Sequence, residues 1–264
     1  MKIRHFLYNA FIIEEQKTKI AIDPGQNLYL FNLSSLIPKA EWETFTHILI
    51  THGDPDHYWH ADRIALAAGA PLIMNTSMIK QTESDIFILK PRHTHKLEYT
   101  KYTGEALPIR TNETIDVGNV QIQGIQTTHG PIEVNFFGIV KQKAPGPDER
   151  VGYGAIGYKI EVNDKTLVNL GDTLYQKEWN GLKADVLMLP IGGLGNNKWT
   201  MDITDALQAV KDISPKIVIP CHYNVPFLWK KKMCQADNEY FKRGVESLGI
   251  KCQIMHYGES ITVN

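Results

Sequence analysis

Short apolar runs rich in β-branched residues dominate the hydrophobic pattern of this chain. They predict strands over residues 3–8, 10–14, 18–22, 46–50, 120–126, 136–140, 155–162, 166–170, 186–189 and 217–219. Helical signals are rarer and predict helices over 59–68, 203–213 and 236–248, the second with Asp202 as its N-cap. Strands come first, and strands and helices alternate in the second half. We therefore expect a layered α/β or α+β fold.

Polar clusters follow several of these predicted strands directly. Loops at the ends of core strands are where α/β proteins gather their chemistry, so the clusters are candidate site segments. They are Asp23-Pro24-Gly25, Thr51–His57, Thr127-Thr128-His129, Gly171-Asp172-Thr173 and Pro220-Cys221-His222.

The densest cluster is the run His52-Gly53-Asp54-Pro55-Asp56-His57. Two carboxylates and two imidazoles this close would repel and be poorly solvated if they packed without a cation. A divalent ion removes both problems and uses these donors directly. Gly53 and Pro55 argue against an immediate helix start, so we expect the side chains to radiate from a turn.

Three further donors, His129, Asp172 and His222, each follow an apolar run at the same kind of position. A single histidine at a strand end is usually structural, but the recurrence favours convergence on one site. The pair His93 and His95 lies in a polar, lysine-containing stretch with no converging partner. We interpret that pair as a surface feature.

Composition narrows the class of protein. The chain has 264 residues, 43% hydrophobic and 22% charged, with a formal net charge of −1. This is ordinary for a soluble globular protein and gives no global electrostatic footprint for nucleic acid. Three cysteines without a CxxC motif, and no apolar run of about 18 residues, favour a cytoplasmic protein without a membrane span. We expect the Gly- and Pro-rich segment 142–154 to be a loop near the site rather than a linker.

The order His52-x-Asp54-x-Asp56-His57, then His129, Asp172 and His222, resembles the metallo-β-lactamase superfamily of hydrolases. The resemblance implies a four-layer αββα sandwich forming a single domain over residues 1–264. Within the superfamily, the stretches 199–202 (WTMD) and 220–223 (PCHY) resemble the branch of ascorbate-6-phosphate lactonase and related metal-dependent hydrolases. Asp54 is a departure, because most members have histidine there.

The resemblance implies two divalent metal ions. His52, Asp54 and His129 would hold the first ion, Asp56, His57 and His222 the second, and Asp172 would bridge them. The nucleophile would be a metal-bridging hydroxide, which Asp56 could orient. Zinc is the expected metal, with manganese or iron as alternatives because Asp54 is a hard oxygen donor. Asp23 would act behind the ligands, and Lys198 and His256 are candidate substrate contacts.

The expected function is hydrolysis of a small ester, lactone or phosphoester, with a lactonase-like activity favoured. Phosphodiesterase activity is an alternative, since a few phosphodiester-cleaving branches also have aspartate at the position of Asp54. A metal-containing sensor without catalysis is an alternative of another class. The expected partner is a small-molecule substrate rather than nucleic acid or a membrane. Relatives in the lactonase branch often form oligomers, which makes a homo-oligomer a further expectation.

Overall fold

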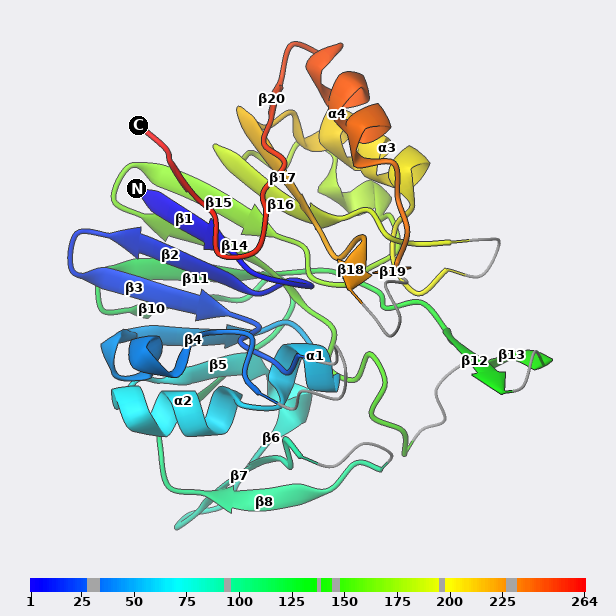
Figure 1. Cartoon of the computed structure of the whole chain (residues 1–264). Coiled ribbons are helices and arrows are strands. Elements are labelled where there is room, and N and C mark those ends of the chain that lie inside the picture. The colour runs from blue at the N-terminus through cyan, green and yellow to red at the C-terminus, as the bar shows by residue number, and fades with distance from the viewer. Residues whose placement is uncertain (28–33, 93–95, 137–138, 144–147, 195–197, 227–231) are drawn as a thin grey trace.

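Two seven-stranded sheets pack face to face in the computed structural model, which describes residues 1–27, 34–92, 96–136, 139–143, 148–194, 198–226 and 232–264 (Figure 1). The first sheet has the order β21 (Ser260–Thr262), β1 (Lys2–His5), β2 (Phe11–Glu15), β3 (Thr18–Ile22), β4 (His47–Ile50), β5 (Leu72–Asn75) and β9 (Ala106–Ile109). The second has the order β10 (Thr114–Val117), β11 (Val120–Ile125), β14 (Gly157–Val162), β15 (Lys165–Asn169), β16 (Val186–Pro190), β17 (Ile217–Cys221) and β20 (Lys251–Cys252).

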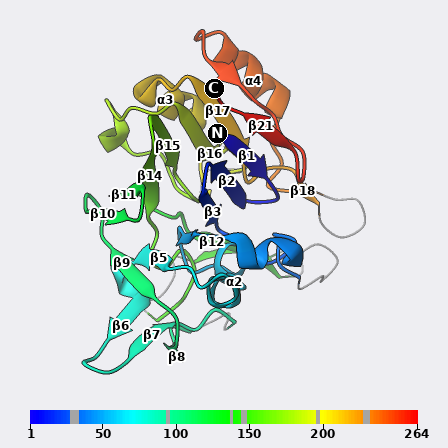
Figure 2. The same cartoon turned by 90° about the vertical axis from the view of Figure 1, so that its left-hand side faces the viewer.

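Helices cover the outer face of each sheet, so the molecule has four layers in the order α, β, β, α (Figure 2). The 3-10 helix η2 (Lys39–Thr44) and helix α2 (Ala61–Ala68) lie outside the first sheet, and α3 (Ile203–Ile213) and α4 (Asn238–Glu246) lie outside the second. The predicted αββα sandwich is confirmed.

Strand alternation produces this layering, because successive side chains of a strand point to opposite faces. In β3, Ile20 and Ile22 enter the core between the sheets, whereas Ala21 packs under the outer helices. In β16, Met188 faces the core between the sheets and Leu187 faces α3 and α4. Central strands are therefore apolar on both faces, which explains why they read as continuous apolar runs.

The carboxyl ends of the central strands lie at one edge of the sandwich. β3, β4, β5 and β9 run parallel in the first sheet, as do β15, β16, β17 and β20 in the second. The Tyr158 hydroxyl donates to the Ile50 carbonyl at 2.6 Å and ties the two sheets together close to that edge. The predicted polar clusters therefore meet in space.

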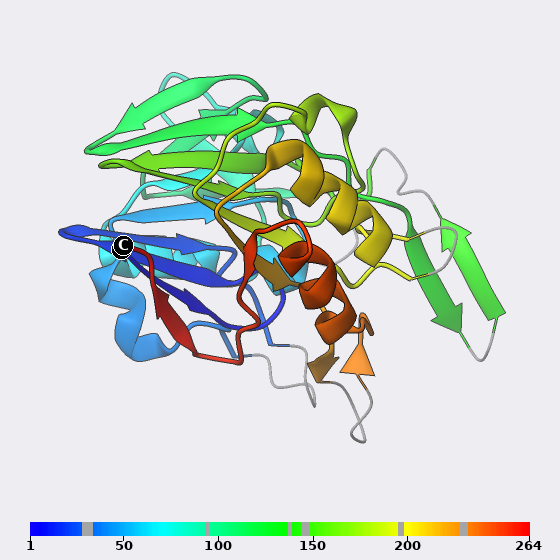
Figure 3. The same cartoon turned by 90° about the horizontal axis from the view of Figure 1, so that it is seen from above.

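Smaller elements surround this frame. β6 (Ile79–Gln81), β7 (Ile86–Leu89) and β8 (Tyr99–Tyr102) form a three-stranded sheet, and β18 (Val225–Pro226) pairs with β19 (Lys232–Met233). β12 (Ile132–Phe136) and β13 (Ile139–Lys143) form a hairpin that extends away from the sandwich (Figures 1 and 3). Two further 3-10 helices among the described residues are η3 (Thr76–Met78) and η4 (Lys177–Trp179). Among the described residues, no helix is long and apolar enough to cross a membrane.

Three element predictions were wrong. The strand expected over 136–140 spans the end of β12 and the start of β13, which are separate antiparallel strands. The helix expected over 59–68 begins at Ala61, and a separate short helix, α1 (Pro55–Tyr58), precedes it. The sequence pattern also missed the strands between residues 72 and 117. The apolar pattern is weak in β6 and β10, where several positions are exposed, whereas β5 was missed although it is a short, largely buried apolar run.

Candidate metal centre

A short helix carries the densest group of donors. α1 starts at Pro55, directly after Asp54 as its N-cap residue, which corrects the expectation that the run would form a turn without a helix. Proline is favoured at the first helical position because its fixed φ suits a helix and its missing N–H would have had no partner there. Asp56 and His57 lie on this helix, whereas His52 and Asp54 lie on the extended segment before it.

The first group of donors joins both sheets. His52 follows β4, His129 follows β11 and Asp172 follows β15, and one ligand atom from each lies within 4.8 Å of the others. Asp54 Oδ2 lies 3.2 Å from His52 Nε2 and 3.5 Å from His129 Nε2. These four side chains could therefore surround one cation.

The second group lies beside the first. Ligand atoms of Asp56, His57 and His222 also lie within 4.8 Å of one another. Asp172 Oδ2 is 2.9 Å from His222 Nε2 and 3.6 Å from His57 Nε2. Asp172 thus contacts the second group while belonging to the first. All seven donors that the sequence singled out meet in one place.

Carboxylates and imidazoles alternate in the centre, and each kind of group shifts the pKa of the other. Burial opposes ionisation of Asp172, but the imidazoles of His222 and His57 hold its pKa well below the usual value. Burial likewise opposes a charge on His57, but the carboxylates of Asp56, Asp172 and Asp23 raise its pKa well above 6.5. Without metal, the carboxylates keep protons on His57 and His222, whereas burial lowers the pKa of His129; a divalent cation would replace those protons.

Among the buried atoms without a hydrogen-bond partner in the described part of the chain, four face this centre. They are His52 Nε2, His57 Nε2, His222 Nε2 and Asp172 Oδ1. Such atoms are costly to bury unless something binds them. Metal coordination by imidazole and carboxylate would satisfy all four, so the residues fit the cation that the sequence implies.

Asp23 holds the ligand loops from behind. It is fully buried, and its Oδ2 accepts from His57 Nδ1 at 2.8 Å and from the Thr51 hydroxyl at 2.6 Å. Its Oδ1 accepts from the Thr51 backbone N–H at 2.8 Å. A carboxylate on the second nitrogen of a ligating histidine fixes the ring and its tautomer. By contrast, Thr128, which precedes His129 in its predicted cluster, is exposed.

A pair of buried asparagines behind Asp23 was not anticipated. Asn9 Nδ2 donates to Asp23 at 2.7 Å and to Asn169 Oδ1 at 2.9 Å, and Asn169 Nδ2 donates back to Asn9 at 2.9 Å. Asn169 Oδ1 also accepts from the Gly171 backbone N–H next to Asp172. The pair links the ligand loops of the two sheets. Asn169 ends an apolar strand pattern, and that was the signal available in the sequence.

Arg150 is a second unanticipated residue, from the segment that we expected to be a loop near the site. Its buried guanidinium donates to three backbone oxygens: Gly53 at 2.5 Å, Lys90 at 2.7 Å and Pro91 at 2.9 Å. The Gly152 N–H lies 3.2 Å from Asp54 Oδ1. The described part of the segment therefore does lie against the ligand loop.

Gly152 must be glycine for two reasons. Its φ is +61°, and a Cβ there would lie 2.5 Å from His129 Cβ. The close approach lets its N–H reach Asp54 while His129 packs on its other side. The His129 Nδ1 is fixed by the Gly130 carbonyl at 2.7 Å.

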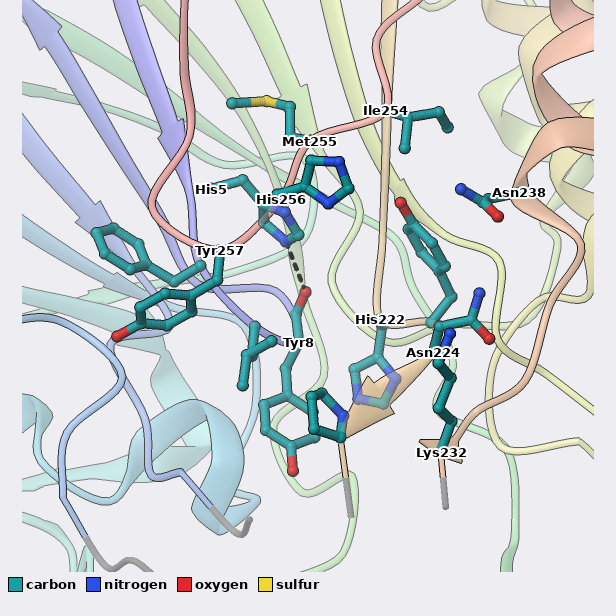
Figure 4. Close-up of a pocket in the computed structure, with 14 residues that line it drawn as sticks. His5, Tyr8, His222, Asn224, Lys232, Asn238, Ile254, Met255, His256 and Tyr257 are labelled. Atoms are coloured by element: carbon teal, nitrogen blue, oxygen red, sulfur yellow. Dashed lines mark hydrogen bonds between the residues drawn. The ribbon is translucent and has the colours of Figure 1, made fainter. Parts of the chain in front are cut away.

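The two candidate substrate contacts are placed differently. Lys198 Nζ lies 2.5 Å from carboxylate oxygens of both Asp202 and Asp205, so its charge is already paired. His256 is exposed and lines a cavity of about 280 Å³ that also reaches His222 (Figure 4). His93 and His95 lie outside the described residues.

Comparison with known proteins identifies the family. The model of the β-lactamase superfamily domain matches residues 2–222. The chain belongs to the metallo-β-lactamase superfamily. A metal-dependent hydrolase of Alkaliphilus metalliredigens is 31% identical over 94% of both chains, and one of Nanoarchaeum equitans is 29% identical over 99% of both. This superfamily member is accordingly a metal-dependent hydrolase.

Solved structures agree on the fold. A metallo hydrolase from Ignicoccus hospitalis superposes with a TM-score of 0.70 at 24% identity, covering 100% of this chain and 98% of the other. A diiron β-hydroxylase from Streptomyces venezuelae also shares the fold, with a TM-score of 0.65, although it is only 12% identical and 54% of it is covered. The same superfamily fold thus supports different chemistries, and activity has to be argued from the site.

Proposed function

We propose that this hydrolase holds two divalent ions and cleaves a small ester, lactone or phosphoester, with a lactone favoured. The observation that carries the proposal is the convergence of seven donors from both sheets, with Asp172 between two groups. His52, Asp54 and His129 would bind the first ion, Asp56, His57 and His222 the second, and Asp172 both. Zinc suits the imidazoles, and the three carboxylates also suit manganese or iron.

Bound divalent ions would supply a Lewis acid for the scissile carbonyl or phosphoryl oxygen and make water a nucleophile at neutral pH. The side chains of the protein would position the attacking water and the metal ligands. Asp56 is less buried than Asp172, with 16% of its side chain exposed, and would accept a hydrogen bond from the attacking water. Asp23 would keep His57 in one tautomer during turnover.

Metal content tests the ligand assignment. The purified chain should contain about two divalent ions, and Asp172→Ala should lose both because its carboxylate serves both groups. His52→Ala should lower the affinity for the first ion, and His222→Ala should lower the affinity for the second. His47→Ala is the matched control, since His47 is a buried histidine at the opposite end of β4 from His52, where its Nε2–H donates to the Val117 carbonyl. Full metal retention in all three site variants would refute the assignment.

Substrate panels separate the two hydrolytic candidates. The favoured lactonase rests on the likeness of residues 199–202 and 220–223 to the lactonase branch, and a phosphodiesterase is favoured by Asp54. Lactones, simple esters and bis-p-nitrophenyl phosphate should be tested with zinc and with manganese. Turnover of lactones without diester cleavage supports the first, the reverse pattern supports the second, and ligand binding without any turnover indicates a sensor.

A further inference from the structure

The cavity beside His222 lies between the turn after β1, the β18–β19 pair, the start of α4 and the segment that precedes β21 (Figure 4). His222 belongs to the candidate metal centre and also lines this cavity. A molecule in the cavity would therefore sit directly against a metal-binding imidazole.

His222 differs from the other three imidazoles in its second nitrogen. The Nδ1 atoms of His57, His129 and His52 contact Asp23, the Gly130 carbonyl and the Thr51 hydroxyl respectively. His222 Nδ1 is buried and has no hydrogen-bond partner among the described residues. Because metal-binding histidines almost always donate the other N–H to an acceptor, one is needed here.

The charged residues that line the cavity indicate what kind of molecule would supply that acceptor. Its described lining includes Lys232 and His256 but no aspartate or glutamate. Lys232 has no carboxylate within ion-pair distance in the part of the chain that the structure describes, unlike Lys198, whose charge is paired twice. Figure 4 shows Lys232 extending towards Asn224 in the lining of the cavity. An unpaired ammonium facing a carboxylate-free cavity favours a negatively charged occupant.

We propose that this cavity binds the oxyanion of the substrate, a carboxylate or a phosphate, on Lys232, while His222 Nδ1–H donates to a substrate oxygen. The apolar side chains of Leu7 and Ile254 in the lining would contact the carbon skeleton. The proposal rests on the proposed hydrolytic site and specifies its substrate class: small molecules that carry an anionic group away from the scissile bond.

Hydroxamates with different tails test the proposal without turnover. The hydroxamate binds the metal centre, and tails of two to four methylene groups end in a neutral amide, a carboxylate or a phosphonate. Of the two anionic probes, the one that the metal-loaded chain prefers should bind about tenfold more tightly than the amide-tailed probe. This is the gain expected for a charged hydrogen bond in a partly enclosed cavity. Carboxylate and phosphonate arms distinguish the two kinds of oxyanion.

Lys232→Met should abolish that preference and leave affinity for the amide-tailed probe unchanged, whereas Lys232→Arg should retain most of it. Lys39→Met is the control, because Lys39 is an exposed lysine outside the cavity. Equal affinity for neutral and anionic tails in the unmodified chain would overturn the proposal. Hydrolysis is measured separately: its absence with a retained tail preference would overturn the proposed function alone.

Discussion

Asp54 is held by neighbours that are far away in the sequence. The Gly152 N–H that it accepts lies 98 residues on, and Arg150 binds the carbonyl of Gly53. Burial lowers the pKa of Arg150 to about 10, and Asp54 acts in the opposite direction. The guanidinium therefore stays charged at neutral pH and offsets part of the negative charge that three carboxylates bring to the centre.

Replacing Arg150 should weaken both the fold and the metal centre. Arg150→Met leaves three backbone oxygens without their donor, and we expect the free energy of unfolding to fall by about 3 kcal/mol. Metal affinity should fall as well, because the Gly53 carbonyl is no longer fixed. Denaturant unfolding and metal titration measure the two effects. Arg243→Met, at an exposed position on α4, is the control. Unchanged stability would contradict the role assigned to Arg150.

At the scale of elements, helix α3 begins with the N-cap residue that the local sequence predicts. Asp202 is its N-cap as predicted, with Oδ1 accepting from the Asp205 N–H at 2.9 Å, and Oδ2 pairs with Lys198. The cap satisfies a backbone N–H that the helix itself leaves free. The same side chain thus fixes the helix start and neutralises a lysine near the site.

Two substitutions at Asp202 separate these roles. Asp202→Ala removes the cap and should lower the free energy of unfolding by about 1 kcal/mol. Asp202→Asn keeps a capping oxygen and loses only a partly exposed ion pair, which should cost less than about 0.5 kcal/mol. Thermal unfolding of both variants checks the order. An equal loss in both would show that the ion pair, not the cap, stabilises this helix start.

Most of the correctly predicted strands are buried on both faces, although the short buried strand β5 was missed. β3, β16 and β17 are apolar on both faces, so their runs are continuous and their ends point to the site. The missed strands β6 and β10 have exposed positions, and β9 contains Pro108, which weakens a strand pattern.

Site residues could be predicted where a local sequence pattern marks them. The seven donors could be found because each follows a strand end or crowds with like donors. Arg150 could not, because its partners are backbone carbonyls of Gly53, Lys90 and Pro91, and the sequence does not encode that contact locally. The cavity beside His222 could not be predicted from the sequence either, because four separate chain segments form it.

At the scale of the whole molecule, the donors come from both sheets. His52 and His57 follow the first sheet, and His129, Asp172 and His222 follow the second. Under the proposed assignment, bound metal joins the two halves at their open edge, where Tyr158, the Asn9–Asn169 pair and Arg150 are among the other links.

Metal removal should therefore lower global stability. A ligand that binds only the native state stabilises it by about 4 kcal/mol when its concentration is a thousand times its Kd. We expect the Tm to fall markedly in a chelator and to recover when zinc or manganese is added back. Calorimetry measures this, and Asp172→Ala should show little response to either treatment. A chelator-insensitive Tm in the unmodified chain would contradict the bridging role of the centre.

The division of donors between the sheets also has a consequence for synthesis. The ribosome makes His52 to His57 early, whereas Asp172 and His222 come much later. Under the proposed assignment, neither complete group of donors can form before the second sheet closes on the first, so high-affinity metal uptake would follow the docking of the two halves. Metal binding would then come after folding rather than during the synthesis of the first sheet.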